Sequence, residues 1–267
     1  MKHSVHSYEG LLFFVKKRRL LLVFVALFTI ACVSGLKAQD ESNDPVSKQL
    51  WLDFNPSYKV AERVTLYGAV GARTIFPNTW SRYLITPSVK YDWPRMILKN
   101  YKYKEELHAG VGVFFTDNND AVNRLEIRPF QGYSLTMPNR HRIQIKHFVK
   151  LEERFEMETD DWVNTFGLRL RYTASVTFRF HGEVWAKGNG FFIPVSGEFF
   201  WNLKGTKQFN DKIRLMPGIG RDLSPDWKVL FLFGWFYSKA SAEDPFNSHE
   251  MLFRLRVYHK FHKRNNK

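Results

Sequence analysis

The chain has 267 residues, of which 44% are apolar and 16% are aromatic, and this composition excludes a disordered protein. A mean hydropathy of −0.35 excludes a bundle of membrane-spanning helices. The formal net charge is +14, and the single cysteine excludes a disulfide framework.

Residues 1–38 are predicted to be a cleaved secretory signal peptide. The basic cluster 16–19 precedes the apolar run 20–32, and small residues follow up to the expected cleavage site after Ala38. The apolar stretch 20–35 has 16 residues, whereas a membrane-spanning helix needs roughly 20. An uncleaved membrane anchor and lipid attachment at the cysteine that ends the apolar run are the two alternatives. The sequence also leaves open whether translation starts at Met1 or Val15.

Cleavage would change both the charge and the cysteine content of the protein. Residues 1–38 contain six Lys and Arg and one acid, so the mature chain has 34 basic and 25 acidic residues, a net charge of +9. Cys32 would be lost, which leaves no thiol for a zinc cluster or for catalysis. Part of the net positive charge therefore belongs to the predicted export signal, and we expect no nucleic-acid partner.

After a polar leader at residues 39–48, the chain is predicted to form a β-barrel domain over residues 49–262, followed by a basic tail at 263–267. Apolar and polar residues alternate along the domain, as on strands that have one apolar and one polar face. Eleven runs show this pattern, at residues 49–59, 63–70, 80–91, 106–113, 121–135, 141–155, 164–179, 190–201, 211–222, 227–238 and 250–262. Tilted membrane strands need about 9–11 residues, whereas globular strands average about 5–6. The length of the runs thus argues against a soluble barrel with its apolar face inward.

We therefore predict an all-β fold, a transmembrane antiparallel up-and-down β-barrel of about 10–12 strands in the outer membrane of a Gram-negative bacterium. Single-chain bacterial barrels have even numbers of strands, so we expect 10 or 12 strands and not 11. Aromatic residues near the predicted strand ends suit the interface with lipid headgroups. They are Trp51, Trp80, Tyr91, Trp93, Tyr101, Tyr103, Trp162, Trp185, Trp201, Trp227 and Tyr237.

Several prolines are an argument against regular strands. Each would remove a hydrogen bond from the ladder, so we expect them to mark bulges or strand ends. They are Pro56, Pro87, Pro129, Pro194 and Pro217.

If the apolar face meets lipid, the charged face lines the interior. The residues that we predict as an interior ligand-binding set are Arg128, Arg142, Lys146, Lys150, Glu152, Arg154, Arg169, Arg171, Arg254 and Arg256. The same face carries Arg73, Arg82, Lys90, Glu126 and Arg214. Crowded cations attract anions, which favours a small anion-preferring pore or an anionic-ligand site. Ion pairs that plug a narrow lumen are the competing hypothesis and the one that we favour.

No catalytic residue, metal site or cofactor is predicted. The chain lacks G-x-S-x-G, H-E-x-x-H and a phosphate-binding glycine loop. His141 and His147 have the parity of lipid-facing positions, and no serine stands close to either in sequence. An outer-membrane lipid-modifying enzyme is therefore a distant alternative. The expected partners are outer-membrane lipid and the barrel-assembly machinery, with small anions added under the pore hypothesis, and the oligomeric state is not indicated.

Four segments resemble an uncharacterised family of outer-membrane β-barrels that is described only as a domain of unknown function. They are Leu50–Phe54, Arg128–Gln131, His147–Phe155 and Gly167–Tyr172. The resemblance extends over about residues 50–261. It implies a barrel fold and an outer-membrane location, and it supplies no activity.

Overall fold

A computed structural model describes most of the chain after the predicted signal peptide. The described residues are 47–76, 80–94, 96–97, 103–119, 121–137, 142–180, 190–205, 210–239 and 246–262. The signal peptide predicted at 1–38, most of the leader and the tail at 263–267 lie outside them. Within the described residues, no helix has the length and apolar character needed to cross a bilayer.

The described residues form thirteen strand segments in a single sheet. They are β1 (Ser47–Lys59), β2 (Val64–Tyr67), β3 (Val70–Phe76), β4 (Trp80–Ile85), β5 (Ser88–Asp92), β6 (Lys104–Asn118), β7 (Arg124–Thr136), β8 (Ile143–Glu158), β9 (Asn164–Arg179), β10 (Phe191–Lys204), β11 (Asn210–Asp222), β12 (Trp227–Ser238) and β13 (Asn247–Phe261). β2 and β3 both pair with β1, and β4 and β5 both pair with β6. Each of these couples is therefore one barrel strand with a short interruption, and the described sheet has eleven strands in all.

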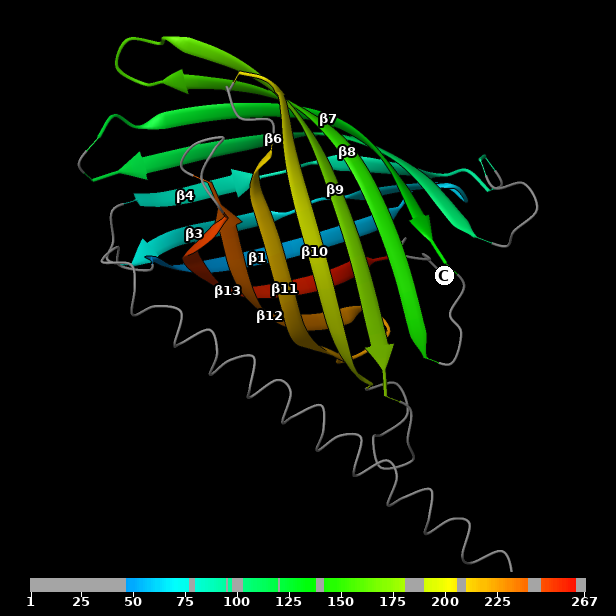
Figure 1. The fold of residues 1–267 in the computed structure, drawn as a ribbon. Helices are drawn as coiled ribbons and strands as arrows, with labels where there is room; N and C mark the ends of the chain where they lie inside the picture. Colours follow the sequence, from blue (N-terminus) through cyan, green and yellow to red (C-terminus); the bar gives the residue numbers. More distant parts are fainter. Residues whose placement is uncertain are drawn as a thin grey trace, which may run out of the picture. The chain divides into compact units, whose positions relative to one another are not determined.

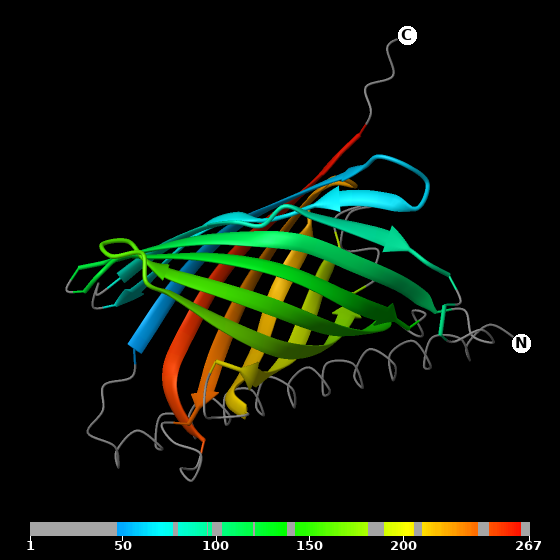
Figure 2. The ribbon, with the colours of Figure 1, turned by 90° about the horizontal axis from the view of Figure 1, so that it is seen from above.

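The sheet closes on itself, and the all-β barrel prediction is confirmed (Figure 1). Neighbouring strands are antiparallel, except that β1 pairs with β13 in parallel over twelve residue pairs. Figure 2 shows these two strands, blue and red, side by side. With an odd number of up-and-down strands, the first and the last run in the same direction, so the closing ladder has to be parallel. The predicted range of 10–12 strands is confirmed, whereas the expected even number is wrong.

The barrel presents its apolar side chains outward and its charged side chains inward. Among outward-facing residues, Tyr83 is 54% exposed, Ile219 is 52% exposed and Val70 is 50% exposed. Among inward-facing residues, Glu152 is fully buried and Asp53 is 4% exposed. Water-soluble proteins bury their apolar surface and rarely expose contiguous apolar patches of more than a few hundred Å². The alternation seen in the sequence therefore corresponds to a barrel that is inverted relative to a soluble one.

Part of the interior is packed with apolar side chains. Trp51, Met216, Phe236 and Leu252 form a buried cluster inside the barrel, and the rings of Trp51 and Phe236 lie 6.0 Å apart. The placement of Trp51 in an aromatic girdle is therefore wrong. It lies at an inward position of β1, on the same face as Asp53, and a tryptophan near a strand end belongs to a girdle only if its parity points outward.

Four of the five prolines lie inside strands, and only Pro87 marks a strand break as expected. Pro56, Pro129, Pro194 and Pro217 lie within β1, β7, β10 and β11. Pro87 lies in the interruption between β4 and β5. A proline within a strand removes only the one ladder hydrogen bond that its N–H would donate. The register of β10 and β11 accordingly continues through Pro194 and Pro217.

Candidate functional site

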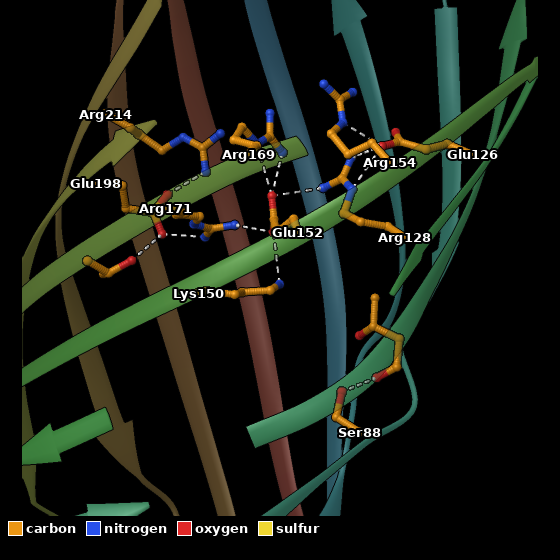
Figure 3. Close-up of polar contacts among 12 residues, drawn as sticks. Ser88, Glu126, Arg128, Lys150, Glu152, Arg154, Arg169, Arg171, Glu198 and Arg214 are labelled. Atoms are coloured by element: carbon orange, nitrogen blue, oxygen red, sulfur yellow. Dashed lines mark hydrogen bonds and ion pairs between the residues drawn. The ribbon is translucent and has the colours of Figure 1, made fainter. Parts of the chain in front are cut away.

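The centre of the charged interior is Glu152 on β8, a fully buried carboxylate surrounded by four cations (Figure 3). Lys150 Nζ lies 2.9 Å from Oε1, and Arg169 Nη2 lies 2.7 Å from Oε2. Arg171 and Arg128 approach to 3.7 and 4.0 Å. The sheet register brings these groups together, because Glu152 pairs directly with Arg169 and Lys150 pairs with Arg171.

Two further carboxylates extend this network along the barrel wall. Glu198 on β10 accepts hydrogen bonds from Arg171 at 2.5 Å and from Arg214 at 2.7 Å. Glu126 on β7 accepts hydrogen bonds from Arg128 at 2.6 Å and from Arg154 at 2.8 Å. Arg154 also pairs with Glu156. Each carboxylate thus has at least two arginines, which is the geometry that charge-assisted hydrogen bonds favour.

A separate ion pair crosses the parallel seam between β1 and β13. Arg254 Nε donates to Asp53 Oδ2 at 2.5 Å, and the Asp53 side chain is fully buried. Two residues further along β13, Arg256 Nε donates to Asn55 Oδ1 at 3.0 Å. The two arginines are therefore held differently, one by a carboxylate and one by a neutral amide.

These side chains surround a cavity of about 480 Å³, here called the charged chamber. Its cationic lining consists of Arg73, Arg82, Arg128, Lys150, Arg154, Arg169, Arg171, Lys212, Arg214, Arg254 and Arg256. Its carboxylates are Asp53, Glu152 and Glu250. Even with Glu126, Glu156 and Glu198 added, the described residues provide eleven cations against six carboxylates. The chamber is therefore strongly electropositive.

Three of the chamber arginines have no carboxylate within ion-pair distance in the described part of the chain. The guanidinium of Arg73 lies 3.8 Å from the ring centre of Trp51, and its buried Nε has no hydrogen-bond partner. Arg82 Nε donates to Thr116 Oγ1 at 2.7 Å. Arg256 has the bond to Asn55 described above. Buried cations of this kind can attract an anion from outside the chain.

A second polar cluster lies around Glu106 on β6, which is 2% exposed. Lys90, Lys104 and Lys146 approach its carboxylate to 2.8, 2.7 and 3.5 Å. His108 lies beside it, with Nε2 at 3.0 Å from Ser134 Oγ and Nδ1 at 2.8 Å from Tyr67 Oη. Ser134 is fully buried and also donates to Glu106 at 3.2 Å.

Eight of the ten residues predicted as an interior set line the charged chamber. They are Arg128, Lys150, Glu152, Arg154, Arg169, Arg171, Arg254 and Arg256. Lys146 faces the interior but belongs to the Glu106 cluster.

The placement of Arg142 in the interior is wrong, because β8 begins only at Ile143. Arg142 is an exposed turn residue with φ of 74°, and its carbonyl oxygen accepts a hydrogen bond from the Arg179 amide. The period-2 pattern applies only inside a strand.

Several interior residues escaped the sequence reasoning. Asp53, Asn55, Glu106 and Glu198 have inward parity on their strands, so the same alternation that identified Glu152 could have found them. The prediction named mainly basic residues, although acidic and neutral residues share the same face of the strands.

One group of acidic residues could in principle hold a metal ion. Carboxylate oxygens of Glu158, Asp160 and Asp161 lie within 4.8 Å of one another at the turn after β8. Asp160 and Asp161 are exposed to solvent, and such surface acids are common without a metal. We assign no metal to them.

The fold and the chamber together define a class, a closed β-barrel with an apolar outer face and a cation-rich interior. The chain belongs to the family described as protein of unknown function (DUF2490), whose model matches residues 48–247. The predicted resemblance to a domain of unknown function is thereby confirmed. No curated protein matches the chain.

Proposed function

We propose that the barrel spans the outer membrane of a Gram-negative bacterium and acts there as a closed, non-conducting structure. The observation that carries the proposal is the inverted distribution of side chains, with exposed apolar residues such as Ile219 outside and the buried Glu152 inside. β6 to β13 have 12–16 residues, enough for the about 9–11 that a tilted membrane strand requires. The predicted export signal is consistent with this location.

A closed lumen is supported by the burial of inward-facing side chains. Glu152 and Leu252 are 0% exposed and Phe236 is 2% exposed, although all three point to the inside of the barrel. Water in an open channel would reach such residues. The ion pairs around Glu152 and the apolar cluster around Trp51 occupy part of the interior beside the charged chamber, which supports a lumen without a continuous channel.

Fractionation and gel migration test the proposed location. We expect the mature protein in the outer-membrane fraction, and we expect it to migrate faster on a gel when unheated than when boiled. Recovery in the soluble periplasmic fraction, with the same migration in both samples, would refute the proposal.

Conductance tests the closed lumen. After reconstitution in a planar lipid bilayer, we expect no steps of current at any voltage. Anion-selective steps would instead support the second candidate, a small pore for anions, which the excess of cations in the charged chamber favours.

We propose no catalytic role. The Ser134–His108 pair has the hydrogen bond of a nucleophile and its base, but Ser134 is fully buried, so a substrate cannot reach its oxygen. On the outer face, His147 Nδ1 lies 2.8 Å from Tyr172 Oη, and among the described residues no serine, threonine or cysteine is hydrogen-bonded to either side chain. Mass spectra of outer-membrane lipids from a deletion strain should match those of the parent strain, and a loss of an acyl group or headgroup modification would contradict this view.

A further inference from the structure

The charged chamber adjoins a second interior cavity of different chemistry. This cavity of about 330 Å³, here called the aromatic chamber, is lined by Tyr67, Phe114, Phe130, Phe148 and Tyr258. The two chambers share the cations Arg128, Lys150 and Arg256 in their lining. A largely apolar pocket with a few polar groups at one end is typical of sites for small organic ligands, which have volumes of about 300–1,000 Å³.

An apolar groove lies on the outer face of the barrel against the same stretch of wall. The groove has a volume of about 250 Å³, and Leu66, Val70, Ile85 and Phe261 contribute to it. The groove and the aromatic chamber share Pro56, Ser57, Tyr67, Gly68 and Ala69 in their lining. Ser57, Gly68 and Ala69 have little or no side chain, so at these positions the wall between the inside and the outside of the barrel is little thicker than the backbone itself.

The ladder in this part of the wall is irregular, although backbone bonds still cross it from Gly68 N to Pro56 O at 3.1 Å and from Thr86 N to Ala69 O at 2.8 Å. Pro56 and Pro87 have no N–H to donate, and two barrel strands are interrupted at this level, one between β2 and β3 and the other between β4 and β5. Side chains replace some of the missing bonds, because Asn55 Nδ2 donates to the Gly68 carbonyl at 3.1 Å and the Ala69 amide donates to Thr86 Oγ1 at 3.0 Å. Because Pro56 and Pro87 supply no N–H, the wall here has two fewer backbone donors than a ladder of the same length without proline.

We infer that the aromatic chamber binds a single-chain lipid with an anionic head, specifically a long-chain carboxylate, which enters from the bilayer through the wall at Gly68–Ala69. The inference rests on the proposed membrane location. The acyl chain would lie in the groove and the aromatic chamber, and the carboxylate would reach the cations that border the charged chamber.

Arg256 is the residue that the carboxylate would contact. It lines both chambers, and among the described residues it donates to the neutral Asn55 and lies 4.8 Å from the ring centre of Tyr258. By contrast, Lys150 already pairs with Glu152 and Arg128 with Glu126. A guanidinium whose partners among the described residues are neutral can take a carboxylate without first breaking an ion pair.

Energy transfer to a fluorescent fatty acid tests the inference. The mature barrel is reconstituted in phosphatidylcholine vesicles, and cis-parinaric acid is titrated while its excitation by the protein's tryptophans is followed. We expect saturable transfer that stearate displaces and that neither methyl stearate nor inorganic phosphate displaces. Displacement by phosphate would overturn the inference in favour of a small-anion site. Equal displacement by methyl stearate would also overturn it, because it would show that no cation of the protein recognises the carboxylate.

Two variants locate the site. Arg256→Gln should weaken binding of the probe about tenfold, the worth of one charge-assisted hydrogen bond. Arg124→Gln is its control, since the Arg124 side chain is 55% exposed at the start of β7, far in sequence from the wall. Ala69→Phe should abolish saturable transfer by filling the thin wall, whereas Ala109→Phe, at an exposed outward position of β6, should leave it intact.

The outcomes separate this inference from the proposed function. A barrel that inserts into vesicles but shows only non-saturable transfer overturns the lipid site and leaves the membrane proposal standing. A protein that fails to insert refutes the membrane proposal, and the lipid site with it. If Ala69→Phe does not fold, unchanged binding by the folded Arg256→Gln variant is by itself sufficient to overturn the inference.

Discussion

Two regions of the barrel interior differ in how their charges are balanced. On β7 to β11, every buried carboxylate of the network has at least two cations, as around Glu152 and Glu198 (Figure 3). On β1 to β5 and β13, Arg73 and Arg256 have no carboxylate partner among the described residues, and the wall is interrupted. Ion pairs therefore stabilise one side of the barrel interior, whereas the other side has arginines without a carboxylate partner among the described residues, and there we propose a binding site.

The largest effect should follow from breaking the balanced region at its centre. Glu152→Gln would leave four cations without their shared carboxylate, so we expect a loss of about 3–5 kcal/mol in the free energy of unfolding. Urea unfolding in phospholipid vesicles, followed by tryptophan fluorescence, measures it.

The control for this variant is Glu158→Gln, because Glu158 pairs with Arg124 at a partly exposed site. It should change stability by less than about 1 kcal/mol. Equal losses for the two variants would show that the balanced network does not stabilise the barrel.

Two neighbouring arginines of β13 allow the stability of the two regions to be compared within one strand. Arg254→Gln removes the cation from the fully buried Asp53 and should cost about 3 kcal/mol. Arg256→Gln removes only a bond to Asn55 and should cost about 1 kcal/mol or less. The same unfolding measurement compares them, and the distinction between the two regions fails if Arg256→Gln is the more destabilising change.

A smaller effect should appear at the thin wall. A Cβ on Gly68 would lie 2.7 Å from the carbonyl oxygen of Thr86, so Gly68→Ala should cost about 1–3 kcal/mol through crowding of the backbone. A Cβ on Gly197 would meet nothing within 4 Å, so Gly197→Ala should change stability by less than about 0.5 kcal/mol. Equal stabilities in urea would indicate that the wall at Gly68 is looser than the structure shows.

The sequence was sufficient to predict the barrel and most of the charged chamber. Period-2 alternation decides which side chains point inward, and Glu152 and Arg169 follow from it directly. The odd number of strands differs from the expected even number. Eleven alternating runs are present in the sequence, but single-chain bacterial barrels usually have even numbers of strands. The misplacement of Arg142 came from extending the alternation beyond the strand end.

The thin wall could not be predicted at all. It depends on Pro56, Gly68 and Pro87 lying at one level of three neighbouring strands. Each residue by itself resembles an ordinary strand irregularity. Only the register shows that the irregularities coincide, and register is a tertiary property.

We propose that the outer face of the barrel meets lipid. Cys32 is the single cysteine of the sequence and lies in the predicted signal peptide, so single cysteines can be introduced into a chain that starts after residue 38 and spin-labelled without interference. For Phe115→Cys and Ile219→Cys, at outward positions, we expect collisions with oxygen dissolved in the bilayer to exceed those with a water-soluble nickel complex. For Thr173→Cys, at an inward position of β9, we expect neither reagent to collide at the rate found for lipid-facing sites. Greater access of the nickel complex to the outward labels would contradict the claim.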